Sequence, residues 1–425
     1  MRNFSLLVLI TGTILSGGSL SAQTRKVLSI EDACIQAVAN YPATQQKAVY
    51  DVQARLAIEQ LNKNYLPQLN LSGQASYQSE VTKIQIPLPN FSISPLDKDQ
   101  YKLVADVNQL IYDGGVLASQ KKLQQLQYAS EKQKIEIELF RLKDKVRQLY
   151  MGILWMDAQL QLLTLVEKDL SQAMDKIAAQ LTQGTSTRTA LNLLTAEKLK
   201  ISQRKIEVNS GKLGWMESLK VWIPFDDSNE WTFVWPKTEK SRLEDSIIRP
   251  ELYLYQMQQA LLKEQNRLNH IKNLPKAGAF IQGGYGRPGL NFLKNEFSPF
   301  YIAGIRLNWS LSGFYTQKQE AQQIQQQSKQ LSLQEQSFLM GTQAQLKQQA
   351  KEVDKYDGLI EMDHEIIALK EQILGATKVQ LEQGLITAND YVRELNALDQ
   401  ARQQLIAHQI QAIQARINYE TLRGE

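Results

Sequence analysis

Few residues in this sequence combine the types and the spacing that enzymatic chemistry requires. Gly284-Tyr285-Gly286-Arg287-Pro288-Gly289 satisfies the pattern G-x-G-x-x-G and follows a predicted strand. In nucleotide-binding proteins such a loop leads into a helix whose N-terminus holds a phosphate. Pro288 and the Pro- and Phe-rich stretch after it begin no helix, so the pattern predicts a turn between two strands.

Histidine and cysteine are equally unsuited to a reactive site. His270, His364 and His408 lie in three separate predicted helices without the spacing of metal ligands. Cys34 is the only cysteine, so no intramolecular disulfide can form, and its helical surroundings predict a small buried thiol. The sequence also contains no serine nucleophile elbow and no paired-carboxylate cleft. We therefore expect no enzyme activity, no cofactor and no bound metal.

The composition favours long helices and gives no reason to expect nucleic acid as a partner. The 425 residues include 48 Lys and Arg against 44 Asp and Glu, a formal net charge of +4, without a dense basic run. Glycine and proline are scarce, and glutamine is abundant, especially over residues 317–349. Such a composition is typical of extended helices rather than of a compact mixed core.

The first residues are typical of an export signal. Arg2 supplies a short positive region, residues 4–15 are mostly apolar, and residues 16–22 are small. This pattern predicts a signal peptide over residues 1–22 that is cleaved after Ala22. No later run reaches the roughly 18 apolar residues that a spanning helix requires. An exported chain of this kind would enter a membrane only as a closed β-barrel.

Four short stretches alternate between apolar and polar residues, which is the period of a β-strand. From Leu69 to Tyr77 every second residue is apolar or small, and the residues between them are polar and uncharged. The predicted strands cover residues 68–78, 101–112, 276–285 and 301–311. An apolar face with aromatic residues near its ends suits a lipid-facing barrel wall, and the polar face predicts a water-filled lumen.

Two long predicted helices, over residues 116–183 and 315–383, follow the second and fourth strands. Apolar residues recur every seven positions along both, and in the first helix a second series follows four residues later. Sustained heptads of this kind predict coiled coils. Each helix ends at a Gln-Gly pair, at Gly184 and Gly384, and the chain then turns back in a further helix. In the first helix the two series are Ile135, Leu142, Leu149, Met156, Leu163, Leu170, Ile177 and Leu139, Val146, Ile153, Leu160.

The second half of the sequence repeats the first. Pro42 and Pro67 are separated by the same number of residues as Pro250 and Pro275. We predict one repeat over residues 23–221, a connector over 222–248 and a second repeat over 249–425. Four strands are too few to close a barrel, so other copies of the chain must supply the remaining strands under cyclic symmetry.

Several motifs, in this order and duplicated, resemble the TolC-like outer-membrane factor family. They are the opening LSIEDACIQAVANYP, the RPEL restart at Arg249–Leu252, the Leu-Pro pairs before the strands, the IYDGG end of the second strand and the two Gln-Gly turns. The resemblance covers essentially the whole mature chain. It implies an α+β membrane protein: a homotrimer with one transmembrane β-barrel and a periplasmic α-barrel of long antiparallel coiled-coil helices.

The resemblance also implies the role of a passive exit duct in tripartite efflux or type I secretion. The barrel would contact outer-membrane lipid, and the helical tip would contact a periplasmic membrane-fusion adaptor that connects it to an inner-membrane transporter. The alternative is a periplasmic coiled-coil scaffold or adaptor with small β-hairpins and no pore. Four strands of about membrane length, each with an apolar face, favour the duct.

In that family acidic residues form a pore constriction near the second helical turn. Asp390, six residues after Gly384, matches the first ring aspartate. The second ring position holds Arg393, or Asn396 in a shifted alignment, and Glu394, one turn from Asp390 on the same face, could substitute for the missing acid. The predicted constriction residues are therefore Asp390, Glu394 and Arg393. The alternative interpretation is a solvated helix start at which Asn389 caps the helix and Asp390 favours its dipole.

The two helical turns are the predicted contact with the adaptor. Gly184 and Gly384 supply the left-handed conformation that ends each helix. Leu385 and Ile386 are apolar residues at a tip that should be exposed, as a partner-binding surface would require. The predicted tip residues are Gly184, Thr185, Gly384, Leu385, Ile386 and Thr387.

Overall fold

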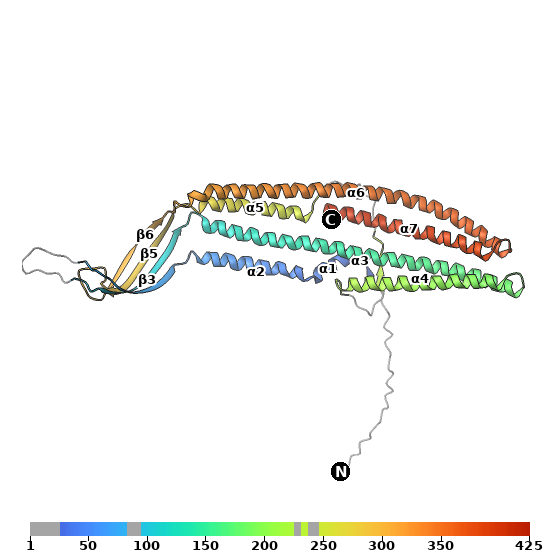
Figure 1. Cartoon of the computed structure of the whole chain (residues 1–425), viewed down its shortest axis with the longest axis horizontal. Coiled ribbons are helices and arrows are strands. Elements are labelled where there is room, and N and C mark those ends of the chain that lie inside the picture. The colour runs from blue at the N-terminus through green and yellow to red at the C-terminus, as the bar shows by residue number, and fades with distance from the viewer. Residues whose placement is uncertain (1–25, 83–94, 225–230, 237–245) are drawn as a thin grey trace, which may run out of the picture.

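The computed structural model of the protein describes residues 26–82, 95–224, 231–236 and 246–425. Over these residues the chain is an elongated rod (Figure 1). A four-stranded sheet forms one end, and helices run lengthwise from it to two hairpin turns at the other end. The predicted signal peptide, part of the loop after the first strand of the sheet and part of the predicted connector lie outside the described residues.

The sheet is antiparallel, with the strand order β2-β3-β5-β6. β3 and β5 pair the two halves of the sequence, while β2 and β6 have one neighbour each and form open edges. All four strands predicted from alternation are confirmed. Their bounds are Gln68–Tyr77 (β2), Asp99–Tyr112 (β3), Lys276–Arg287 (β5) and Ser298–Asn308 (β6).

The strand register gathers apolar residues from all four strands on one face. Leu71 lies opposite Ala105, Ala105 opposite Gly283, and Gly283 opposite Tyr301. Because side chains alternate along each strand, residues that share these positions point to the same side of the sheet. Leu71 and Tyr301 are 73% and 79% exposed, so this large apolar face is uncovered in a single chain.

Several strand boundaries differ from the prediction, none by more than three residues. The predicted turn at residues 284–289 instead begins inside β5, which continues to Arg287. The last strand ends at Asn308 rather than Leu311, because the chain turns there into the next helix. At this junction the Trp309 indole Nε1 donates a 3.0 Å hydrogen bond to the Asn273 carbonyl, which joins the end of β6 to the segment that precedes β5.

Seven helices form the rest of the described chain. α3 and α6 each run for about 100 Å at 1.5 Å per residue. α3 packs against α2 and α4 and also against α5 and α7, and α6 packs against α5 and α7 (Figure 1). The helices are Ile30–Asn40 (α1), Pro42–Lys63 (α2), Val116–Thr182 (α3), Arg188–Lys220 (α4), Pro250–Ile271 (α5), Phe314–Glu382 (α6) and Ala388–Arg423 (α7).

The heptad residues of α3 form the core of the bundle, as predicted. The described part of the chain contains two clusters of buried apolar residues, one at mid-length around Val146 and Ile153 and one toward the hairpin turns around Leu163 and Leu170. By length and composition, α3 also includes a window apolar enough to cross a membrane. Several apolar side chains of α3, among them Val146, Ile153 and Leu163, lie in these two clusters, and 44% of the window is buried inside the bundle.

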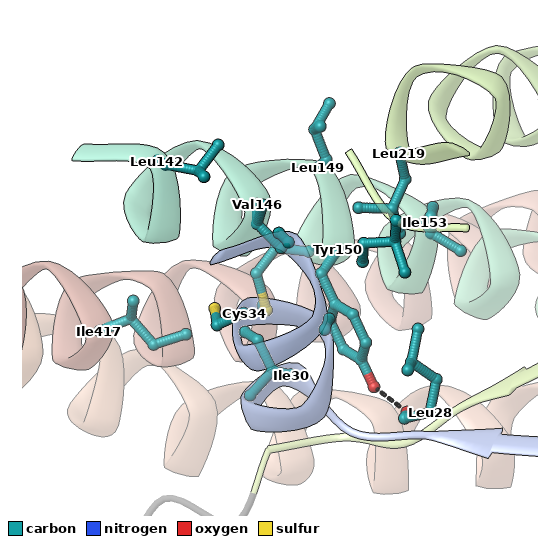
Figure 2. Packing of buried hydrophobic residues seen from close by; sticks show 14 of the residues in the cluster. Leu28, Ile30, Cys34, Leu142, Val146, Leu149, Tyr150, Ile153, Leu219 and Ile417 are labelled. Atoms are coloured by element: carbon teal, nitrogen blue, oxygen red, sulfur yellow. Dashed lines mark hydrogen bonds between the residues drawn. The ribbon is translucent and has the colours of Figure 1, made fainter. Parts of the chain in front are cut away.

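At mid-length a small parallel sheet, β1 (Lys26–Leu28) with β4 (Trp231–Phe233), packs on α3. The buried Tyr150 holds this sheet: its hydroxyl donates to the Leu28 carbonyl at 2.7 Å and accepts from the Val234 N–H at 2.8 Å (Figure 2). Burial raises the pKa of Tyr150 to about 12. Cys34 lies in the same cluster as a buried free thiol, as predicted.

Candidate functional site

The two hairpin turns at the end of the rod have the same backbone geometry. Gly184 and Gly384 adopt φ angles of 74° and 73°. In each turn the glycine N–H and the next N–H bond back to carbonyls of the preceding helix, at 3.1 Å and 2.9 Å. This is the Schellman ending, in which a left-handed glycine satisfies the last helical carbonyls. The predicted role of both glycines in ending the helices is therefore confirmed.

The tip side chains differ between the two turns. Thr185 is exposed in the first turn, and at the same position of the second turn Leu385 is 69% exposed. Ile386 is only partly exposed, because it packs against the buried cluster of residues that includes Leu381 and Tyr391. The expectation of two apolar side chains in solvent thus holds for Leu385 alone.

Thr387, not Asn389, caps α7. Its hydroxyl accepts from the Asp390 N–H at 3.3 Å, while the Asp390 Oδ2 accepts from the Thr387 N–H at 3.2 Å and from the Thr387 hydroxyl at 2.7 Å. Such a reciprocal capping box satisfies two N–H groups that the helix leaves unpaired. Hydrogen bonds from Thr387, together with the charge of Arg393, hold the pKa of Asp390 below its usual range.

Arg393 and Glu394 form a small charged cluster with Asp390 within one chain. The Arg393 guanidinium lies 3.8 Å from the Asp390 Oδ1 and 3.4 Å from the Glu394 Oε1. Glu394 also lies 3.6 Å from the Lys370 ammonium on α6. The structure therefore brings the three predicted constriction residues together, and it places a cation between the two acids.

A buried polar network links the two hairpins and was not foreseen. Asp399 on α7 is 7% exposed and lies 3.8 Å from the Arg204 guanidinium on α4. Gln403 donates to the Asp399 Oδ2 at 2.5 Å and accepts from Arg204 at the same distance, whereas the Asp399 Oδ1 has no hydrogen-bond partner within the described chain. Burial raises the pKa of Asp399 despite Arg204 nearby.

The sequence did contain a signal for this network. Val392, Asp399, Ile406 and Ile413 are spaced seven apart on α7, so Asp399 occupies an apolar position of a heptad. A polar residue at such a position fixes register or partner at a cost in stability. Two further contacts cross between the hairpins: Asn396 donates to Glu197 at 3.1 Å, and Lys176 pairs with Glu382.

The face of the sheet opposite the apolar face is less uniformly polar than predicted. β2 contributes Gln68, Asn70, Ser72, Gln74 and Ser76 to it. On β5 and β6, however, the same face includes Phe280, Phe300 and Ile302. On these two strands the neighbouring positions, which point to the other face, hold the apolar residues from which the alternation was read. The pattern of a single strand therefore did not show that the face between them is partly apolar as well.

In the described part of the chain, no group of three or more His, Cys, Asp or Glu residues is arranged to hold a metal ion. The histidines remain on separate elements: His408 on α7 contacts Asp363 on α6 at 2.6 Å, and His270 contacts Gln317 at 3.2 Å. These contacts are ordinary links between neighbouring helices.

Part of this chain is similar to a known protein family. Residues 33–209, which are less than half of the chain, match the sequence model of the family described as "Outer membrane efflux protein". The match runs from within α1 to within α4 and includes β2 and β3, which are the strands and the first coiled-coil hairpin that the sequence motifs singled out. No curated protein matches the chain by sequence.

Solved structures of outer-membrane proteins share the fold of this chain over nearly its whole length. VceC from Vibrio cholerae has a TM-score of 0.65 at 13% identity, over 93% of this chain and 96% of that protein. The Campylobacter jejuni CmeC outer membrane channel has a TM-score of 0.66 at 11% identity, over 93% of this chain and 85% of that protein. The Neisseria gonorrhoeae MtrE outer membrane channel, in an open state, has a TM-score of 0.66 at 12% identity, over 93% of this chain and 89% of that protein.

Proposed function

We propose that three copies of this chain form an outer-membrane exit duct, a passive channel-tunnel from the periplasm to the exterior. The observation that carries the proposal is the sheet. One of its faces is apolar and exposed, the opposite face is rich in polar groups, and its two edges, β2 and β6, are open. It lies at the end of a rod of amphipathic helices (Figure 1).

Closure of the sheet requires further copies. Within lipid every backbone N–H and C=O group needs a partner, so an open strand edge cannot persist there. β6 of one copy would pair with β2 of the next, and cyclic symmetry would close the ring. The face with Leu71 and Tyr301 would then contact lipid, and the face with Asn70 and Ser72 would line the lumen.

The order of elements supports an internal duplication. The succession helix, strand, strand, helix, helix occurs as α2-β2-β3-α3-α4 and again as α5-β5-β6-α6-α7. We assign repeat 1 to residues 23–221, the connector to 222–248 and repeat 2 to 249–425. The signal peptide over residues 1–22 would direct export, which leaves the helices in the periplasm and the sheet in the outer membrane.

The tip is the proposed contact with a periplasmic adaptor, through which an inner-membrane transporter would deliver substrate. Gly184, Thr185, Gly384, Leu385, Ile386 and Thr387 form its two turns. A photo-crosslinking residue at position 385 should capture an inner-membrane-anchored coiled-coil protein in cells. The same probe at Val221, which is 78% exposed but distant from the tip, should not. Equal capture at both positions, or none at 385, would argue against docking at the tip.

Asp390, Glu394 and Arg393 are the proposed constriction. In a trimer the clusters of three chains would surround the axis at the same height and place carboxylates around the pore. Rings of acidic side chains attract cations in channels. Since Arg393 lies between the two acids, the proposal is a ring of ion-paired carboxylates rather than of free ones.

A matched pair of substitutions tests the barrel. Leu71 and Ser72 are neighbours on β2 and point to opposite faces. Leu71→Lys would place a charge in lipid, at a cost of about 2–4 kcal/mol near the midplane, whereas Ser72→Lys would face water. We expect only Leu71→Lys to lose heat-resistant trimers from the outer-membrane fraction. Equal behaviour of the two variants would instead favour the pore-free periplasmic scaffold.

A further inference from the structure

We propose that the inward face of the β5–β6 hairpin binds planar aromatic anions as they enter the barrel from the helical tunnel. The site consists of Phe280, Phe300 and Arg306, with Lys276 near it. The inference rests on the proposed function, because this face lines a lumen only when several copies close a barrel. It adds a substrate class to that function.

The two phenyl rings lie against glycines of the neighbouring strand. A Cβ atom on Gly284 would meet the Phe300 Cζ at 2.4 Å, and one on Gly304 would meet the Phe280 Cε1 at 3.1 Å. Each ring thus covers bare backbone, where a larger residue would displace it. Both rings remain partly exposed on the face opposite the lipid-facing residues, and they offer flat apolar surfaces toward the lumen.

A cation lies next to this platform. The Arg306 guanidinium is 4.6 Å from the centroid of the Phe280 ring. Among the described residues, no carboxylate lies within ion-pair distance of Arg306. A guanidinium stacked on an aromatic ring keeps its N–H donors available at the edge, where they can hold a sulfonate or carboxylate.

The charges of the inward face reinforce this preference. By register, Lys102, Lys276 and Arg306 lie on this face together with a single acid, Asp106, a net charge of 3 − 1 = +2 per chain. Asp106 accepts a 2.8 Å hydrogen bond from Gln282. Lys276 is the first residue of β5 and Arg306 lies close to the end of β6, so two of the cations lie where the tunnel meets the barrel.

The combination selects for aromatic anions in particular. Rings of Arg and Lys side chains favour anions in pores, and every small anion would experience that field. Stacking on Phe280 or Phe300 adds attraction only for a planar aromatic group. The packing of aromatic rings over strand glycines also stabilises strand pairing. That structural role requires neither the positive charge nor the lumen, so it predicts no effect on which anions block the channel.

The test is current block in planar bilayers by 1-naphthalenesulfonate, with methanesulfonate as the non-aromatic probe. We compare wild type, Arg306→Gln and Phe280→Leu. The control is Lys294→Gln, the same charge change in the exposed loop after β5. Arg306→Gln should raise the half-blocking concentration of naphthalenesulfonate about tenfold, as expected for one lost charge-assisted hydrogen bond. Phe280→Leu should raise it about threefold and leave methanesulfonate unaffected.

The outcomes separate the inference from the function on which it rests. Channels whose block by naphthalenesulfonate is unchanged in Arg306→Gln and Phe280→Leu would overturn the inference and leave the exit duct standing. The same would follow if wild type were blocked equally by both sulfonates. Folded wild-type trimers that conduct no current would contradict the exit duct itself, and the inference with it.

Discussion

The Asp390 carboxylate takes part in a helix cap and in an ion pair. Its Oδ2 belongs to the capping box with Thr387, and its Oδ1 faces Arg393. Both contacts favour the carboxylate, and they lower the pKa of Asp390. A lowered pKa means that the contribution of Asp390 to tip stability is present at neutral pH. It is lost only as the pH falls through the folded-state pKa. The carboxylate therefore stays charged in moderately acidic surroundings.

The pKa of Asp399 moves in the opposite direction, because burial disfavours its charge. A group whose pKa is raised in the folded state contributes stability that is fully present below its unfolded-state pKa. This stability is lost as the pH rises through the folded-state pKa. Asp399→Asn removes that dependence. We expect the variant to gain thermal stability relative to wild type more at pH 8 than at pH 4.5.

Thermal unfolding of the trimer, followed by circular dichroism at the two pH values, measures this difference. Asp354→Asn, which removes an exposed charge on α6, is the control for a general charge effect. An equal gain or loss for Asp399→Asn at both pH values would show that burial does not raise the pKa of Asp399.

At the scale of single residues, sequence patterns predicted what the local backbone determines. The helix-ending glycines and the buried thiol of Cys34 follow from local spacing, and both are confirmed. The cap at Thr387 was missed although Thr387 and Asp390 have the local spacing of a capping box. The packing of Ile386 was missed because it depends on contacts made once the hairpin folds. The role of Asp399 was not predicted, because its partner Arg204 lies on α4, in the other hairpin.

At the scale of elements, the two coiled-coil hairpins depend on left-handed glycines. No atom lies within 4 Å of a Cβ built on Gly384, so Gly384→Ala would strain the backbone without a clash. A non-glycine residue in the left-handed region costs about 1–2 kcal/mol. We expect Gly384→Ala to lower the thermal stability of the trimer.

Gly341→Ala is the matched control for this prediction. Gly341 lies inside α6, also with no atom within 4 Å of a built Cβ, and its φ lies outside the left-handed region. The change to alanine in a helix interior should stabilise by about 0.5–1 kcal/mol. Loss of stability in both variants would point to side-chain crowding in the trimer rather than to backbone conformation at the tip.

Strand positions were also predictable, because the alternation reports them directly. What single strands cannot report is the register between them. Register places Phe280 and Phe300 over the glycines of the adjacent strand and brings Arg306 to the Phe280 ring. Similarly, the hydrogen bond from Trp309, just after the end of β6, to Asn273 joins residues that lie 36 positions apart in the sequence.

At the scale of the whole molecule, the chain has surfaces that a monomer leaves uncovered. The apolar face of the sheet and the edges of β2 and β6 are open along the same end of the rod (Figure 1). Exposed apolar area of this extent, next to unpaired strand edges, is a liability unless lipid and further copies cover it. The proposed cyclic trimer in a membrane would satisfy both needs.

Single-channel conductance of the purified trimer in planar bilayers tests this arrangement most directly, with wild type and Asp390→Ala measured side by side. We predict discrete, long-lived channels from wild type. In Asp390→Ala, resting conductance or block by divalent cations should change, because the proposed ring loses one carboxylate per chain. Unchanged conductance and block in the variant would remove Asp390 from the constriction. A folded protein that needs no detergent, remains a monomer and forms no channels would contradict the exit duct.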